Sequence, residues 1–422
     1  MKPKILFKGF EDEVWISSQF EEIFELIKNN SLSRAELSSE GRIGNIHYGD
    51  VLVKYGECLD TSSDSITYIR NDEIGEDLYR RGALKSGDII FADAAEDNTV
   101  GKCSELICND EEQIVSGLHT IACRPKIEIT KRYLGYYLNS NAYHNQLLPH
   151  IQGTKVSSIS RKAIVTTSIV YPFAQRVQEL IATYFYRLDN LISTSISRLA
   201  SLKQVKEASL QAMFPQKGET VPKIRFKGFE GEWKKVKLSS FAKRIKRKNS
   251  CMESTLALTI ASALGLVSQN DYFNNSVVGA NIRNYYLLKR GEFAYNKSYS
   301  NGYPFGSVKR LDRYEQGILS TLYIVFTIDD SISSDYLTHF FDTTLWHNDV
   351  AERAAEGARN HGLLNISAED FLDIAIWKPR SIEEQQHIAS YFTSLDKQIA
   401  LQTQRLEKLR QIKAACLDKM FV

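Results

Sequence analysis

Two stretches of the chain, residues 172–214 and 379–422, carry apolar residues at seven-residue intervals, the spacing of a coiled-coil seam. With the complementary seam positions included, the apolar residues are Phe185, Leu188, Ile192, Leu199 and Leu202 in the first stretch and Phe392, Leu395, Ile399, Leu406 and Leu409 in the second. We predict two helices of about 40 residues, each about 60 Å long, packed as an antiparallel coiled-coil pair. Two ordinary helices inside one core are the alternative.

The same two stretches are copies of each other. Aligned without gaps at an offset of 207 residues, Pro172–Phe214 and Pro379–Phe421 share 18 of 43 residues. A shorter repeat joins Pro3–Glu13 to Pro222–Glu232 at an offset of 219 residues. Because the residues between the repeats differ in length and sequence, the chain is predicted to be an internal pseudo-two-fold repeat in which similar frames hold dissimilar inserts.

Between the repeats, short apolar runs alternate with glycine-containing turns, which is typical of β-strands. These runs include Asp50–Val53, Asp88–Phe91, Glu292–Tyr295 and Leu322–Phe326, and shorter helical patterns follow at Tyr133–Leu147 and Tyr336–His347. We therefore expect an α+β protein in four parts. They are a globular domain over residues 1–171, a long helix over 172–214, a second globular domain over 215–378 and a second long helix over 379–422.

The charge balance differs between the two globular parts although the whole chain carries only +2. Residues 1–171 hold 19 Lys+Arg against 25 Asp+Glu, a net −6, whereas residues 215–378 hold 22 against 18, a net +4. This excludes a uniformly polybasic nucleic-acid binder. There is no apolar window of about 20 residues and no signal-peptide pattern, so we expect a cytoplasmic protein without a membrane span.

The sequence lacks the residue patterns of common catalytic and metal sites. The six cysteines contain no Cys-x2-Cys pair, and reduced, scattered thiols are expected rather than a metal site. No two prolines are adjacent, which excludes the Asn/Asp-Pro-Pro-aromatic motif of amino-methyltransferases, and no phosphate-binding loop of the Gly-x4-Gly-Lys-Ser/Thr type is present. We expect a binding or scaffold protein with no catalytic residue and no metal of its own.

Several loops combine cations with amide, hydroxyl and aromatic side chains, a mixture suited to DNA phosphates and base edges. The candidates in the second globular part are Lys246, Arg247 and Lys248 in a basic run, Lys297, Tyr299, Ser300, Asn301 and Tyr303 in a Gly/Pro-punctuated loop, and Arg359, Asn360 and His361 in another. The first part offers Lys102, His119, Lys155 and Ser157. A solvated basic face and loops that only stabilise the fold are the alternatives.

The duplicated helix, of the form Pro-x5-Gln-x2-Ile-Ala-x-Tyr-Phe-x2-Leu-Asp, resembles the specificity subunit of type I restriction-modification enzymes. Shorter sequence segments also resemble the family, among them Gly87–Phe91, Val115–Thr120 and Gly291–Tyr299. The first copy departs from the family in one place. The family usually has Glu directly before the glutamine, as in Glu384-Gln385 of the second copy, whereas the first copy has Arg176-Val177-Gln178. The similarity spans essentially the whole chain.

The resemblance implies that each insert is a target recognition domain for one half of a bipartite, asymmetric site in double-stranded DNA. It further implies that the helix pair sets the spacing and docks two methyltransferase subunits. Those partners would bind S-adenosylmethionine, and restriction/translocase subunits would use ATP and Mg, so this subunit holds no cofactor. Two other hypotheses remain open: a coiled-coil scaffold that never contacts DNA, and a fragment of a fused restriction-methylation enzyme.

Overall fold

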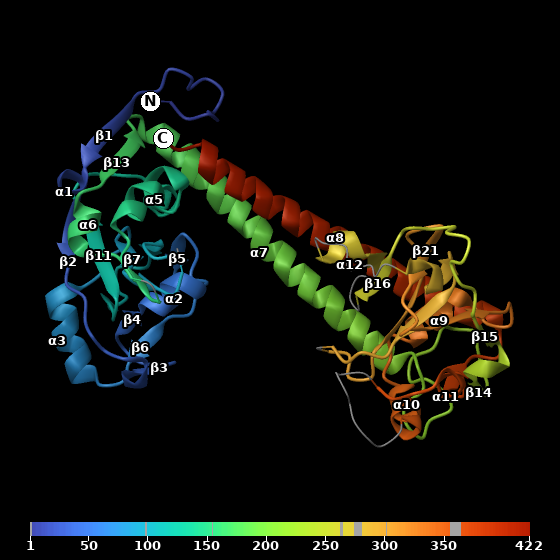
Figure 1. Cartoon of the computed structure of the whole chain (residues 1–422). Coiled ribbons are helices and arrows are strands. Elements are labelled where there is room, and N and C mark those ends of the chain that lie inside the picture. The colour runs from blue at the N-terminus through green and yellow to red at the C-terminus, as the bar shows by residue number, and fades with distance from the viewer. Residues whose placement is uncertain are drawn as a thin grey trace. The chain divides into compact units, whose positions relative to one another are not determined.

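The computed structural model describes residues 2–97, 99–153, 155–261, 265–273, 281–300, 302–354 and 364–422. The chain forms two compact units, and each combines one globular part with portions of two long helices (Figure 1). Unit 1 comprises Met1–Ser197 and Gln404–Val422, and unit 2 comprises Arg198–Thr403.

Unit 1 is built on a five-stranded mixed sheet that is buried at its centre. Its strands, in spatial order, are β2 (Phe24–Ile27), β11 (Thr120–Pro125), β7 (Ile89–Ala92), β9 (Cys103–Ile107) and β5 (Cys58–Asp60). All four residues of β7 are buried, as expected for a continuous apolar run covered on both faces. A four-stranded sheet consists of β10 (Ile114–Ser116), β4 (Gly44–Ile46), β6 (Thr67–Ile69) and β3 (Leu37–Ser38).

Two strand pairs and several short helices complete unit 1. The pairs are β1 (Trp15–Gln19) with β13 (Ser168–Pro172) and β8 (Ala94–Ala95) with β12 (Ser157–Ser158). The helices are α1 (Phe20–Ile23), α2 (Tyr48–Val53), α3 (Asp72–Gly82), α4 (Tyr133–Leu138), α5 (Asn141–Leu147) and α6 (Arg161–Val165), with 3-10 turns η1 (Arg34–Glu36) and η2 (Leu148–His150).

One predicted strand of unit 1 is wrong, because Asp50–Val53 lies in helix α2. The ring nitrogen of His47 accepts the backbone N–H of Gly49 and caps the helix, which satisfies a donor that a strand would have paired. Asp50 is held by both terminal nitrogens of Arg34, each at 2.8 Å. Val51 is fully buried while Val53 is 88% exposed, so the apolar run does not form a buried strand.

Unit 2 has a smaller sheet of four antiparallel strands and three strand pairs. The sheet contains β15 (Ala242–Arg244), β22 (Ile324–Ile328), β19 (Phe293–Asn296) and β20 (Ser307–Arg310). The pairs are β14 (Lys234–Lys237) with β23 (Ala375–Lys378), β16 (Leu258–Ala261) with β17 (Gly265–Ser268), and β18 (Tyr286–Lys289) with β21 (Gln316–Leu319). The helices are α8 (Gln269–Phe273), α9 (Ser334–Phe340), α10 (His347–Arg353) and α11 (Ala368–Leu372), with η3 (Leu238–Ser240) and η4 (Ile282–Asn284).

The two predicted long helices are present as α7 (Gln175–Ala212) and α12 (Ile382–Lys419), each of 38 residues. Each begins three residues after the proline that was expected to start it; Pro172 instead ends β13, where it lies opposite Trp15 of β1. All ten predicted seam residues are buried or half-buried. The prediction of an α+β protein with two long coiled-coil helices is confirmed.

The two helices make matching contacts at their two ends, and these contacts show that they run antiparallel (Figure 1). In unit 1 the Tyr184 hydroxyl lies 3.3 Å from Cys416 Sγ, and in unit 2 the Tyr391 hydroxyl lies 2.9 Å from Ser209 Oγ. The ring pairs Phe185–Phe421 and Phe392–Phe214 have centroids 5.8 and 6.0 Å apart. Because each pair joins equivalent positions of the repeat, the predicted pseudo-two-fold symmetry extends to individual side chains.

The two copies of the short repeat, Pro3–Glu13 and Pro222–Glu232, cap the ends of the long helices in the same manner. We call these two copies the leader segments. The backbone N–H of Ile5 donates to the carbonyl of Lys419 in unit 1, and that of Ile224 donates to the carbonyl of Ala212 in unit 2, both at 2.9 Å. Carbonyls in the last turn of a helix have no partner within the helix. The short repeat therefore supplies a C-terminal cap for each long helix. No helix among the described residues is long and apolar enough to cross a membrane.

Candidate nucleic-acid interface

Three predicted site residues of unit 1 meet at one short segment, Ala92–Ala95. The carbonyl of Lys102 accepts the N–H of Ala92, the carbonyl of His119 accepts the N–H of Asp93, and Ser157 pairs with Ala95 across β12 and β8. Lys155 precedes Ser157 by two residues and is exposed. Residues distant in the sequence thus lie on one part of the unit 1 surface.

His119 stands at the tip of a tight turn over residues 116–120, which we call the His119 turn. Its φ of +54° places it in the left-handed region, which residues other than glycine occupy uncommonly. Its side chain is 52% exposed, and Nδ1 lies 3.0 Å from Oδ1 of Asp93. The ring also meets that of Tyr48 edge-on, with centroids 5.3 Å apart. The imidazole is therefore presented outward in a defined orientation.

Lys102 has a different environment from the other three residues. Its Nζ donates to the carbonyls of Leu52 and Tyr55, both at 2.9 Å, so the ammonium is bound within the protein. Burial lowers the pKa of this lysine. These contacts explain a lysine at this position without a nucleic acid, and we leave Lys102 out of the proposed interface.

A pocket of about 480 Å³ lies beside the His119 turn. Its lining combines Asn29, Asn30, Arg81, Asp93 and His119 with the apolar side chains of Ile74, Leu78 and Leu118. Arg161 donates from Nη2 to Oδ1 of Asn29. Sequence reasoning missed Asn29 and Arg161, because each is an ordinary polar residue until the fold brings Asn29 into this pocket and Arg161 into contact with it.

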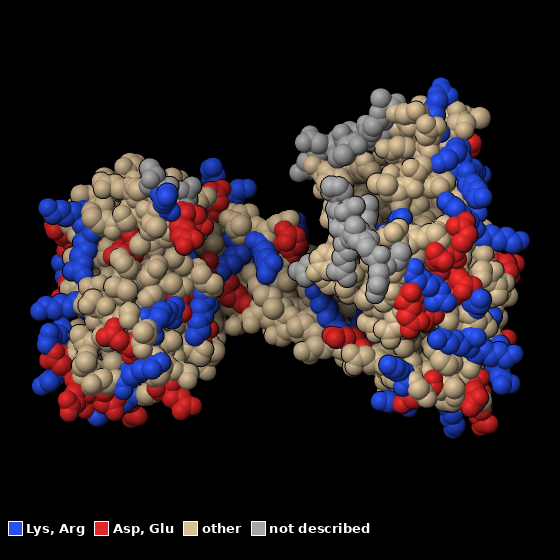
Figure 2. Space-filling view, turned by 60° about the horizontal axis from the view of Figure 1, so that its bottom comes forward, with Lys and Arg blue, Asp and Glu red and all other residues tan. Residues whose placement is uncertain are grey.

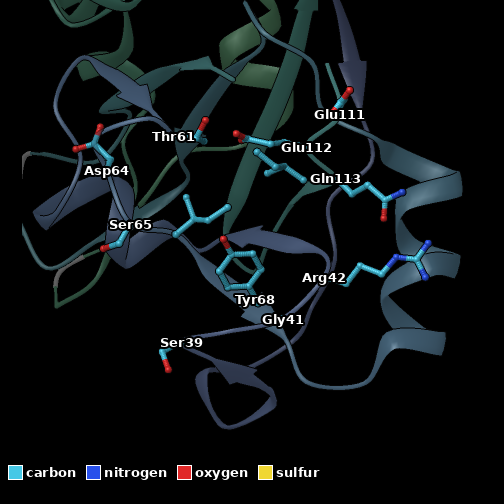
Figure 3. Close-up of a pocket in the computed structure, with 12 residues that line it drawn as sticks. Ser39, Gly41, Arg42, Thr61, Asp64, Ser65, Tyr68, Glu111, Glu112 and Gln113 are labelled. Carbon is cyan, nitrogen blue, oxygen red and sulfur yellow. The ribbon is translucent and has the colours of Figure 1, made fainter. Parts of the chain in front are cut away.

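Another pocket of unit 1, of about 650 Å³, lies elsewhere and carries more acidic than basic side chains (Figure 3). Asp64, Glu111 and Glu112 line it, together with Tyr68. Arg42 also lines it but pairs with Glu76 of α3 at 2.6 Å. Three carboxylates against one paired guanidinium would repel a phosphate, so this pocket is not part of the proposed interface.

In unit 2 the predicted basic run crosses from β15 to β18, and most of its cations are bound internally. Arg244 pairs with Glu369 at 3.1 Å, Arg247 pairs with Glu292 at 2.6 Å, and the Lys248 ammonium lies 4.0 Å from the centroid of the Tyr286 ring. Lys243 and Lys246 are exposed. No hydrogen bond or ion pair joins either of these two lysines to another residue of the described ranges. They are the cations of this run that remain available to a phosphate.

The predicted loop of unit 2 follows strand β19 and presents Tyr299, which is 58% exposed. The N–H of Tyr303 donates to the carbonyl of Ser300 at 2.8 Å and closes a turn in which Gly302 has a φ of +80°. Gly306 also has a positive φ, and a Cβ there would lie 2.0 Å from the Asn296 carbonyl oxygen. Lys297 is half-buried, with Nζ 3.4 Å from the carbonyl of Ile366.

Four candidates, Asn301, Arg359, Asn360 and His361, lie outside the described residues. On the visible face of each unit, basic and acidic side chains are interspersed (Figure 2). This face therefore offers individual exposed cations to a phosphate backbone rather than a broad basic surface.

One cluster among the described residues has the composition of a metal site, but two lysines occupy it. His339, Asp342 and Asp396 lie within ligand distance of one another. Lys206 Nζ, however, lies 2.9 Å from Asp342 and 2.7 Å from Asp396, and Lys309 Nζ lies 3.0 Å from Asp342. The ammonium groups already balance the carboxylates, so the cluster is an ion-pair network.

The chain shares its fold with solved structures over its full length. No protein-family model and no curated protein sequence matches it. The crystal structure of the S subunit of a type I restriction-modification system from M. genitalium has a TM-score of 0.61 at 12% identity, covering 100% of this chain and 99% of that one. A chain from a study of complex assembly and conformational transition of the type I R-M system has a TM-score of 0.54 at 15% identity, covering 99% of both. At these identities the likeness shows the fold.

Proposed function

We propose that this protein is the noncatalytic DNA-specificity subunit of a type I restriction-modification complex. The observation that carries the proposal is the duplicated frame. Two helices with equivalent contacts hold two units of different sequence, and the same fold is found in an S subunit over the whole chain. Two units of different sequence suit a DNA site whose two halves differ. Two equivalent helices suit contacts with partner subunits that are alike on both sides.

The helices have a suitable length for spacing two half-sites. Each α-helix of 38 residues is about 57 Å long at 1.5 Å per residue. Half-sites one turn of DNA apart are separated by about 34 Å. Each unit would read one half of a bipartite site in double-stranded DNA, and the helix pair would set the distance between the halves.

Partner subunits would supply the chemistry. We propose that the repeated regions dock two methyltransferase subunits, which bind S-adenosylmethionine and methylate adenine. Restriction/translocase subunits would then use ATP and Mg for cleavage. This division of labour agrees with a sequence that lacks the methyltransferase and phosphate-loop motifs.

Contacts to DNA would divide by chemistry between the proposed residues. The exposed ammonium groups of Lys155, Lys243 and Lys246 suit phosphates, which position a protein without reading sequence. His119 and Tyr299 offer an imidazole and a phenol, which can reach base edges. Ser157, Ser300 and Tyr303 have hydroxyls that suit either partner.

Mapping methylated adenines across the genome of cells that carry or lack this gene tests the proposal. We expect one split, asymmetric sequence to lose methylation when the gene is removed. A duplex containing that sequence should then shift in mobility with this chain and the methyltransferase present. Unchanged methylation together with an unshifted duplex would favour the coiled-coil scaffold, and methyl transfer by the purified chain alone would favour the fused enzyme.

A further inference from the structure

We infer that His119, held by Asp93, contacts an exocyclic amino group of adenine or cytosine in the half-site read by unit 1. The inference rests on the proposed function and goes beyond it, because it assigns one residue, one atom and one chemical group. Three observations support it: the rigidity of the His119 turn, the anchoring of the imidazole, and the charge beside it.

The His119 turn is held from several sides. The N–H of Gly117 donates to the Ile46 carbonyl at 2.9 Å, and the Ser116 and Thr120 hydroxyls lie 2.6 Å apart. Both the backbone and side-chain N–H groups of Asn30 donate to the Ser116 carbonyl at 2.9 Å. These bonds define the turn independently of the His119 side chain.

The turn also leaves no room for a side chain at Gly117. A Cβ on Gly117 would lie 2.5 Å from Asn45 Nδ2 and 2.8 Å from the Ile46 carbonyl oxygen. A histidine kept at positive φ in such a turn is an unfavourable backbone choice that the surroundings enforce, and residues of this kind gather at functional sites. The other described non-glycine residues at positive φ are Met252 and Arg132, which is the N-cap residue of α4.

Asp93 determines which ring nitrogen of His119 faces outward as an acceptor. A carboxylate only accepts hydrogen bonds, so in the imidazole tautomer that bonds to Asp93 through Nδ1 the proton lies on that nitrogen, 3.0 Å from Oδ1. Nε2 is then left with a lone pair. No hydrogen bond joins Nε2 to any residue that the structure describes. An acceptor at this position is complementary to a donor on the ligand.

The same carboxylate selects a base edge over a phosphate. A phosphate offers only acceptors and carries negative charge, so Asp93, 27% exposed beside the imidazole, disfavours it. Adenine N6 and cytosine N4 are the amino donors that the major groove presents. Asn29 and Arg81 line the adjoining pocket, but Arg161 already donates to Asn29 and Asp77 already pairs with Arg81, so His119 carries the contact by itself.

The test uses the chain assembled with its methyltransferase subunits and duplexes that carry the methylation-mapped site. Each adenine or cytosine of the two half-sites is replaced, one at a time, by an analogue that lacks the exocyclic amino group. Purine 2′-deoxyriboside replaces deoxyadenosine, and 2-pyrimidinone 2′-deoxyriboside replaces deoxycytidine. For the unaltered protein, one replacement in one half-site should weaken binding by tenfold or more. His119→Gly should weaken binding to the natural site by a similar factor. In this variant, the same base analogue should cause no further loss of affinity.

His119→Gly is the primary variant because glycine accepts positive φ, so the turn keeps its conformation without the imidazole. Lys155→Ala is the matched control, since it should weaken binding to all sequences and leave every analogue effect in place. Undiminished analogue effects in His119→Gly would overturn the inference. If the unaltered complex binds no duplex specifically, the proposed function fails, and the inference fails with it.

Discussion

Lys206 and Lys413 occupy equivalent positions of the long repeat and make equivalent ion pairs. Lys206 Nζ lies 2.7 Å from Asp396 on the opposite helix, and Lys413 Nζ lies 2.6 Å from the equivalent Asp189. Each lysine also binds a carboxylate from its own globular part, Asp342 for Lys206 and Glu57 for Lys413. Burial opposes both charges, but the paired carboxylates outweigh it and raise the pKa of each lysine.

Removing one of these lysines should destabilise its unit strongly. Lys413 is 17% exposed, so Lys413→Met leaves the half-buried carboxylates of Asp189 and Glu57 without their cation. We expect the free energy of unfolding, measured by urea denaturation, to fall by about 2–3 kcal/mol, below the loss for a fully buried pair. Lys203→Met, at an exposed position of α7, is the control and should change it by about 0.5 kcal/mol or less. Equal stability of the two variants would contradict the ion-pair account.

Glu105 of β9 is a buried carboxyl group without a lysine or arginine ion-pair partner among the described residues. It is 2% exposed and accepts the backbone N–H groups of Gly135, at 2.8 Å, and of Arg132. Burial raises its pKa from 4.5 to about 7, against the lowering effect of these hydrogen bonds. The site therefore favours the protonated acid.

The stability of unit 1 should consequently depend on pH through Glu105. The pKa of Glu105 is higher in the folded state than in the unfolded state. Its contribution to the free energy of unfolding is therefore fully present below pH 4.5 and is lost as pH rises through about 7. The loss amounts to about 3 kcal/mol. Urea unfolding followed from pH 5 to 8 should show this decline, and Glu105→Gln should flatten it. An unchanged slope in the variant would exclude Glu105 as the cause.

Among the elements, the basic run 243–248, which begins in β15 and pairs with β18 through Lys248, serves two purposes. Arg247 donates to the Leu287 carbonyl at 3.1 Å and pairs with Glu292, so it holds β18 against the start of β19. Lys243 and Lys246 have no such contacts among the residues described, and both are exposed. A run of cations that looks uniform in sequence is thus divided by the fold into structural and available charges.

This division predicts different outcomes for substitutions within one run. Lys243→Ala combined with Lys246→Ala should reduce the slope of log affinity against log salt by up to about 2, since each neutralised phosphate contributes about 0.9. Arg247→Ala should chiefly lower stability. Lys8→Ala with Lys227→Ala removes the same charge from the exposed leader repeats and serves as control in a DNA titration at several salt concentrations. An equal change of slope in both double variants would refute the assignment.

At the scale of the whole molecule, the duplication separates what the two units share from what they do not. The shared contacts lie on the long helices and leaders, as in the ring pairs Phe185–Phe421 and Phe392–Phe214. The candidate DNA contacts all lie in the inserts. Independent readers on a common frame should therefore be exchangeable.

Exchanging residues 20–150 for the insert of a relative should change only one half of the methylated sequence. The donor insert must supply a carboxylate at the place of Glu57, because Lys413 would otherwise be buried without its second partner. Sequencing of methylated adenines in cells with the chimera provides the measurement. Replacement of residues 238–374 is the reciprocal experiment and should change only the other half. A change in both halves from either exchange would contradict independent reading.

The long helices and the duplication could be predicted from the sequence because they depend on local periodicity and on identity between copies. Seven-residue spacing places Phe185 and Leu188 on one face of any helix, whatever surrounds it. Strand β7 was also predictable, since a run of apolar residues suits a doubly covered strand. Asp50–Val53 was not, because its helix depends on contacts with His47 and Arg34 that hydrophobic pattern does not encode.

The candidate sites depended far more on tertiary contacts. His119 was identifiable as a polar loop residue, but its φ, its bond to Asp93 and the neighbouring Asn29 come from segments about 30 to 90 residues away. Lys102 and Arg247 resembled DNA-binding cations, yet carbonyls and a carboxylate bind them. The charge of a side chain is a property of sequence, whereas its availability to a ligand depends on which groups the fold places around it.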